Sequence, residues 1–412
     1  MKNGTLKLFP LLLFYLLLVV LFSSTTLQGD EKNYVDVASS LSQGSFFSNI
    51  EKNLYRGPGY PIVLVPFVLL KLSWFVAKLL NAFFLFGAIL YLYRTLALWL
   101  YENYALIFAF VMGLYPPFIR WLHLIISENL VFFLICGFMF HFCKSQRESK
   151  KTWLHLLISS IFLGFLALTK VLFGYVILVG FLSFLLLYLW KKREVSKKIT
   201  YIYLLALIWC LPYLLLTYSL TGKIFYWATS GGNNLYWMST PYEDEWGSYF
   251  PDIEVEERPE LAQHLEFFNK LTGLSQGERD NEYNKQAIDN IVHYPTKYFR
   301  NWMANIGRLL FSYPFSYTQQ KLSTYYFLIP NMFIVVFFVL SIYPAILRWK
   351  SIPYEIYALL YFSLIAFGGT SLVAADTRQF TPLVPILILW LSFLYVRVMK
   401  IELRPESHIT PF

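Results

Sequence analysis

The sequence predicts an all-α polytopic membrane protein. Of its 412 residues, 57% are hydrophobic and only 14% are charged, which excludes a water-soluble globular domain. The apolar residues form long runs, and most Lys and Arg residues form short clusters between those runs. This pattern is typical of membrane spans joined by cytoplasmic loops that face anionic lipid. The net charge of +9 therefore does not indicate nucleic acid as a partner.

About ten runs qualify as transmembrane helices, because a spanning helix needs about 20 apolar residues. They cover residues 6–27, 72–93, 104–118, 127–143, 154–168, 173–190, 199–218, 325–347, 354–373 and 380–396. The first run could instead be a signal peptide, because Lys2 and Lys7 accompany its start and small residues follow it. However, no Ala-x-Ala cleavage site is present, and an even number of spans fits the charge pattern better.

The loops between these runs separate into two sets. One set is cationic and comprises Lys2, Lys7, Arg94, the clusters 144–151 and 191–198, Arg348, Lys350, Arg397, Lys400 and Arg404. The other set holds Asp30, Glu31, Arg56, Arg120, Glu128, Lys170, the long segment 221–324, Asp376 and Arg378. The positive-inside rule assigns the cationic set and both termini to the cytoplasm, and the other set to the outer face.

We divide the chain into three parts. Residues 1–220 form an N-terminal transmembrane catalytic module with a first outer loop at 28–71, residues 221–324 form an outer cap, and residues 325–412 form the C-terminal spans and a cytoplasmic tail. In the first outer loop, 36–42 and 62–70 resemble interfacial helices. In the cap, the acidic run 243–257 is typical of a solvated surface, and Ser275 is the expected N-cap of a helix that ends before Pro295.

Several ionisable residues emerge together at the predicted outer face. They are Asp30, Glu31, Arg56, Glu128, Lys170 and Arg378. Charges beside hydrocarbon are costly and therefore indicate function. A carboxylate can accept the proton of an attacking hydroxyl, and cations can stabilise a departing phosphate. The set therefore suits an enzyme that joins a hydroxyl to a sugar carried on a lipid phosphate.

Four motifs in order carry a family resemblance. They are Asp30-Glu31 with Tyr34, Ala38 and an Arg-x-Pro-Gly-Tyr-Pro element from Arg56 to Pro61; Ser127-Glu128; Leu168-Thr169-Lys170; and Arg378 ahead of Pro382 and Pro385. With these motifs the sequence resembles the polytopic glycosyltransferases of the C superfamily that use lipid-phosphate sugars. These are related to protein O-mannosyltransferases and to the enzymes that add aminoarabinose to lipid A. The stretch 283–298 also looks like the outer segment of that family.

The resemblance implies roles for individual residues. Asp30 would be the catalytic base of an inverting transfer, with Glu31 orienting it or the acceptor. Arg56, Lys170 and Arg378 would bind donor phosphate. Candidates for the acceptor or a metal are Glu128 and His123, and supporting residues are Tyr34 and Tyr60. Glu128 falls at a position that is sometimes linked to a divalent metal, so a metal cofactor stays open.

The resemblance also implies substrates and a location. The donor would be a polyprenyl-phosphate sugar, and the acceptor a glycolipid, a polysaccharide or a protein. The enzyme would lie in a bacterial inner membrane, with its active site on the periplasmic side.

Other interpretations of the same residues are structural. Asp30 and Glu31 could mark a helix end, and Glu128 could be a first-turn carboxylate behind a Ser127 cap. The three cations could be interfacial side chains, and His123 an interfacial histidine.

Two other functions compete with the sugar transferase. A glycan polymerase or ligase using a lipid diphosphate predicts a longer, Arg-rich outer loop. A transporter or flippase predicts ionisable groups at mid-bilayer.

Overall fold

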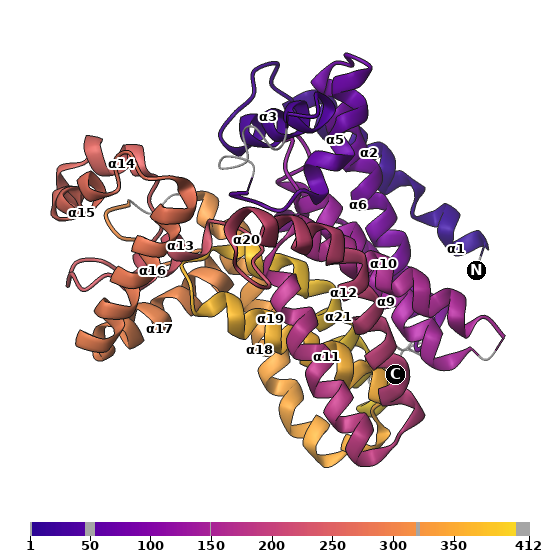
Figure 1. Cartoon of the computed structure of the whole chain (residues 1–412). Helices are drawn as coiled ribbons and strands as arrows, with labels where there is room; N and C mark the ends of the chain where they lie inside the picture. Colours follow the sequence, from indigo (N-terminus) through magenta and orange to yellow (C-terminus); the bar gives the residue numbers. More distant parts are fainter. Residues whose placement is uncertain (1, 46–53, 149, 319–321, 401–412) are drawn as a thin grey trace, which may run out of the picture.

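The computed structural model describes residues 2–45, 54–148, 150–318 and 322–400. Within these ranges the chain is helical and contains no strand, which confirms the predicted all-α class (Figure 1). Arg404 of the predicted cytoplasmic set, and parts of the first outer loop and the cap, lie outside the described residues.

Eight helical segments in the described part are long and apolar enough to cross a membrane. They are Gly4–Phe22, which includes α2 (Phe9–Phe22); α6 (Trp74–Leu96); α9 (Glu128–Arg147); α10 (Thr152–Thr169); α11 (Leu172–Lys191); α12 (Glu194–Thr221); Leu322–Leu347, which includes α18 (Tyr325–Leu347); and Thr377–Val398, which includes α20 (Thr377–Phe380) and α21 (Val384–Phe393). The other two predicted spans correspond to the 12-residue α7 (Glu102–Gly113) and the 18-residue α19 (Tyr354–Ser371).

The two predicted short helices of the first outer loop are present. They are α3 (Asp30–Ser42) and α5 (Gly59–Leu69), which pack against each other beside the end of α6 where that helix begins (Figure 1). Each begins earlier than predicted, because Asp30 and Glu31 form the first turn of α3 and Gly59 opens α5. A carboxylate in a first turn is favoured by the helix dipole. Asp30 is therefore fixed at a helix N-terminus.

The cap is a group of short helices with a small core of its own. It comprises α13 (Gly231–Met238), α14 (Asp252–Glu257), α15 (Leu265–Lys270), α16 (Gln276–His293) and α17 (Pro295–Phe311). Ser275 caps α16 as predicted: its hydroxyl accepts the Glu278 N–H, and the Glu278 carboxylate accepts the Ser275 N–H. Pro295 opens a further helix that the sequence interpretation did not include, because proline suits a first turn.

One expectation for the cap was wrong. The acidic run 243–257 is not entirely solvated, because the Glu245 side chain is buried. Its carboxylate lies 2.8 Å from the His264 ring and accepts a hydrogen bond of 2.6 Å from Gln263. A buried carboxylate needs such partners. Composition alone did not reveal them.

The cationic loops gather at one end of the helix bundle. The clusters 144–151 and 191–198 join α9 to α10 and α11 to α12, at the ends opposite Glu128 and Lys170. Arg147 and Arg397 both donate to carbonyls of the turn after α6, Leu98 and Trp99 respectively. For these described residues, the cationic clusters therefore lie at the opposite end of the bundle from Glu128 and Lys170, as predicted.

Candidate active site

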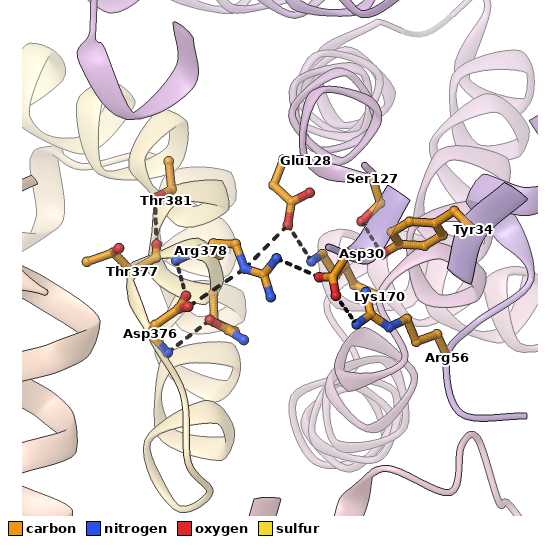
Figure 2. Close-up of polar contacts among 11 residues, drawn as sticks. Asp30, Tyr34, Arg56, Ser127, Glu128, Lys170, Asp376, Thr377, Arg378 and Thr381 are labelled. Carbon is orange, nitrogen blue, oxygen red and sulfur yellow. Dashed lines mark hydrogen bonds and ion pairs between the residues drawn. The ribbon is translucent and has the colours of Figure 1, made fainter. Parts of the chain in front are cut away.

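The centre of the site is the Asp30 carboxylate, which lies between two arginines. Its Oδ1 is 2.7 Å from Arg56 Nη2, and its Oδ2 is 3.0 Å from Arg378 Nη1 (Figure 2). Arg56 comes from the turn before α5, and Arg378 comes from α20, almost 350 residues after Asp30 in the chain. All three side chains are partly exposed, at 27–29%. The ion pairs are thus reachable from outside.

A second carboxylate stands behind the first. Glu128 opens α9 and its side chain is 1% exposed; its Oε1 lies 2.9 Å from Lys170 Nζ, at the end of α10. The same oxygen lies 3.9 Å from Arg378 Nε. Arg378 therefore links the two carboxylates, and the cluster draws on five separate segments of the chain.

The position of Arg378 depends on a tight helix start. Asp376 is the N-cap of α20: its Oδ1 accepts the Arg378 N–H at 2.7 Å, while the Gln379 side chain accepts the Asp376 N–H (Figure 2). The other Asp376 oxygen lies 3.7 Å from Arg378 Nε. This capping box holds the arginine toward Asp30. The sequence interpretation placed Asp376 at the outer face but gave it no role in the site.

The arginines control the charge of Asp30. Burial alone would raise the pKa of this carboxyl, but the hydrogen bond and charge of Arg56, together with Arg378, hold its pKa well below the usual range. Asp30 is therefore ionised at any physiological pH. In this arrangement it is a weak base, because both oxygens are already neutralised.

The cluster lies on the wall of a cavity of about 870 Å³ between the helix bundle and the cap. Asp30, Arg56, Lys170 and Arg378 all line it, and Glu128 does not. The volume lies within the range of pockets that hold small ligands. At this part of the wall the cluster thus presents three cations around one carboxylate, with Asp376 nearby.

Both predicted supporting tyrosines are beside the cluster. The Tyr34 ring lies 5.2 Å from the Arg56 guanidinium and packs edge-on against Tyr60 at 5.1 Å. Tyr34 Oη lies 3.2 Å from Ser127 Oγ. Ser127 is the N-cap residue of α9 and Glu128 lies in the first turn, as the structural alternative held, but the Ser127 side chain makes no capping hydrogen bond. The hydroxyl instead joins α3 to the start of α9.

Glu31 does not join this cluster. It is fully buried on another side of α3, where its oxygens accept the N–H groups of Ile125 and Gln28, each at 2.7 Å. Lys78 Nζ lies 3.2 Å from the same carboxylate and is buried too. Every strong partner of Glu31 is internal, so its geometry fits a positioning residue for α3 better than a catalytic one.

His123 is also separate from the cluster. Burial and the charge of Lys78 lower its pKa, with Glu31 as the nearby acid. It is therefore neutral at pH 7 and lies within electrostatic range of the buried Glu31–Lys78 pair. Sequence reasoning overlooked Lys78, although it is the lone charge within the predicted span 72–93 and was therefore a detectable signal.

The carboxylates do not fit a divalent metal in this arrangement. No group of three or more His, Cys, Asp or Glu side chains in the described ranges is placed to hold a metal ion. Arg378 lies between Asp30 and Glu128, where a shared ion would sit, and Lys170 contacts Glu128. A carboxylate that already pairs with a cation has little charge left for a metal. We therefore assign no step to a metal.

The fold has known relatives among solved structures. The chain is similar to the oligosaccharyltransferase AglB of Archaeoglobus fulgidus in complex with an inhibitory peptide and dolichol-phosphate, with TM-score 0.51 and 14% identity over 95% of this chain and 50% of that one. It is also similar to an apo form of the Archaeoglobus fulgidus oligosaccharyltransferase, with TM-score 0.53 and 13% identity over 95% and 51%. A third similar structure is the Archaeoglobus fulgidus enzyme tethered to an acceptor peptide, with TM-score 0.53 and 13% identity over 96% of this chain and 50% of that one.

These similarities establish the fold and not the activity. The chain has the fold seen in these oligosaccharyltransferases, and it spans about half the length of the structures it matches. No family model and no curated protein matches it.

Proposed function

We propose that this protein is a membrane glycosyltransferase that moves a sugar from a polyprenyl-phosphate donor to an acceptor hydroxyl. The observation that carries the proposal is the meeting of Arg56 and Arg378 on Asp30 at a cavity wall, with Lys170 beside them. A lipid phosphate needs cations, and a hydroxyl nucleophile needs a carboxylate. The fold shared with oligosaccharyltransferases supports this class.

The donor phosphate would exchange places with Asp30 as the partner of the arginines. A phosphate is recognised by guanidinium groups in the same two-point manner as a carboxylate. When Arg56 and Arg378 turn to it, Asp30 loses the contacts that now lower its pKa. Its basicity then rises toward that of an ordinary carboxylate. Binding of the donor would thereby prepare the base.

The transfer would then proceed by inversion. The acceptor oxygen forms a bond to the anomeric carbon while the bond from that carbon to the phosphate oxygen breaks. Asp30 takes the hydroxyl proton, and the lipid phosphate leaves with the bonding electrons. Arg56, Lys170 and Arg378 stabilise the negative charge that grows on that phosphate. Glu128 would hold Lys170 and Arg378 in place from behind.

The location is part of the proposal. We infer an active site at the outer face and cytoplasmic termini, because the cationic clusters 144–151 and 191–198 belong to the end of the bundle opposite the site and the positive-inside rule assigns such loops to the cytoplasm. A bacterial inner membrane fits this arrangement. The donor lipid would reach Asp30 from the outer leaflet.

The test is transfer by purified protein in lipid nanodiscs. Undecaprenyl-phosphate-linked sugars are supplied with an extract of membrane glycolipids and glycans, and the transferred sugar is detected by mass spectrometry. Wild-type protein should transfer at least one sugar, and Asp30→Asn should not. Full turnover by Asp30→Asn would contradict the proposed role. Turnover with undecaprenyl-diphosphate sugars alone would favour the polymerase or ligase alternative.

A further inference from the structure

The part of the cavity that the proposed reaction does not use is formed by the cap. It is lined by Tyr55, Asn233, Tyr249, Asp252, Arg279 and Tyr283. None of these residues was predicted from the sequence as part of a site. Here an Asp, an Arg and an Asn side chain, together with three tyrosines, face one space, a composition unlike the cation cluster at Asp30.

These residues continue directly from the catalytic cluster. The Arg56 guanidinium, which pairs with Asp30, lies 5.8 Å from the centre of the Tyr55 ring. Tyr55 Oη lies 3.2 Å from Tyr249 Oη, which joins the first outer loop to the cap. A ligand that follows this wall would therefore begin beside the base and end in the cap.

The cap end of this wall is polar, and most of its charges are paired: beside Asp252 and Arg279, it includes Asp280, which lies 3.5 Å from Lys223 Nζ, and Arg308, which donates to backbone carbonyls. Arg279 Nη2 pairs with Asp252 Oδ2, and Tyr283 Oη lies 3.5 Å from Asp252 Oδ1. Two of these groups have unused polar atoms: the amide oxygen of Asn233, a residue 6% exposed, and Arg279 Nε are both buried without a partner. Unpaired buried polar groups are costly unless a ligand or water satisfies them.

We propose that this cap wall binds the acceptor and that the acceptor is a neutral carbohydrate. Planar carboxylate, guanidinium and amide groups can each bond two neighbouring hydroxyls, and tyrosine rings pack against the apolar face of a sugar ring. The surplus positive charge around Asp30 suits phosphate, whereas the paired Asp252 and Arg279 suit an uncharged ligand. The inference rests on the proposed transferase function.

A peptide acceptor fits this wall less well. An extended peptide is commonly held by addition to a strand edge, and the described parts of the chain contain no strand. A helical peptide would need a continuous apolar groove. The cap wall instead places hydroxyl, charged and amide groups among its apolar side chains.

Binding can be tested apart from turnover. Full-length Asp30→Asn protein in nanodiscs is mixed with maltotetraose, cellotetraose, chitotetraose or a Ser/Thr-rich peptide, and contacts are read by saturation-transfer NMR. We expect at least one tetrasaccharide to bind. Asp252→Asn and Tyr249→Phe, each added to Asp30→Asn, should weaken that binding about tenfold, because each removes one strong polar contact.

Two matched controls define the site. Glu254→Gln breaks another acid–Arg pair near α14, in which Glu254 Oε2 lies 2.8 Å from Arg258 Nη2. Neither residue lines the cavity. Asp36→Asn changes a neighbouring cavity of about 370 Å³ that shares Tyr34, Tyr55 and Arg56 with the first. Both should leave the binding unchanged.

Three results would overturn the inference: no tetrasaccharide binds, the peptide binds in its place, or Asp36→Asn weakens binding while Asp252→Asn does not. In the active protein, the same cap variants should raise the acceptor KM and leave kcat and the donor KM unchanged. Glycan binding without any sugar transfer would refute the proposed function and leave the carbohydrate site intact.

Discussion

Asp30 and Glu31 are neighbours in the chain, yet their carboxylates enter two different networks. Glu31 is fully buried, and two backbone N–H groups and Lys78 satisfy it. Asp30 is 29% exposed and faces two arginines that also line a cavity. Successive residues of a helix point about 100° apart, so one side chain can enter the bundle while the next faces the cavity. A charge with only internal partners supports the fold, whereas a charge whose partners face a cavity can exchange them for a substrate.

The largest expected difference between the two carboxylates is in catalysis. Asp30→Asn should lower kcat about 10²- to 10⁴-fold, the usual contribution of a general base. Its melting temperature should change little, because the site is partly exposed. The measurement is sugar transfer and thermal unfolding on the same nanodisc preparation. An Asp30→Asn protein that is unfolded, or fully active, would contradict the distinction.

The Glu31–Lys78 pair should show the opposite pattern. Lys78→Met leaves a buried carboxylate without its cation and should destabilise the protein by about 3–5 kcal/mol, measured by chemical unfolding in detergent. The double variant Glu31→Leu/Lys78→Met should recover part of that loss, because no uncompensated charge remains although the N–H groups of Ile125 and Gln28 lose their acceptor. Lys270→Met, which breaks an exposed pair with Glu266, should have no measurable effect. Equal loss in Lys78→Met and in the double variant would argue against a pairing role.

Substitution of the arginines should change the KM for the donor. Arg378→Lys keeps the charge but loses the planar fork, so the donor KM should rise about tenfold. Arg120→Lys is the control, because Arg120 stacks on Trp121 and Phe327, 5.0 Å from each ring, and makes no ion pair with Asp30 in the described structure. A donor KM that responds to Arg120 and not to Arg378 would remove the phosphate assignment.

The smallest expected effect concerns pH. The arginines lower the pKa of Asp30 in the folded protein, so Asp30 keeps its charge well below pH 5. The stabilisation by these ion pairs is therefore fully present above the pKa of Asp30 in the unfolded chain, about 3.9. That stability is lost only as the pH falls through the lower, folded pKa. The profile of kcat/KM should therefore show no Asp30-dependent loss between pH 8 and 5. In Arg56→Gln the acid limb should move to higher pH; an unchanged limb would contradict the coupling.

The sequence predicted the helices and the residues that gather around Asp30, but it did not predict that Glu31 enters a different network. Apolar runs and charge clusters predicted the helices, and the ordered motifs correctly brought Asp30, Arg56, Glu128, Lys170 and Arg378 to one place. Two adjacent residues in the sequence could not show that the Asp30 and Glu31 side chains enter different networks, because that depends on how α3 is rotated against α6 and α9. The cap wall was equally hidden, since Tyr55 and Tyr249 meet across almost 200 residues.

The most direct test is a cryo-electron microscopy structure of the protein with undecaprenyl phosphate. The account predicts the phosphate within hydrogen-bond distance of Arg56, Lys170 and Arg378, with at least one of these arginines released from Asp30. A phosphate bound elsewhere, with Asp30 still held between both arginines, would contradict it.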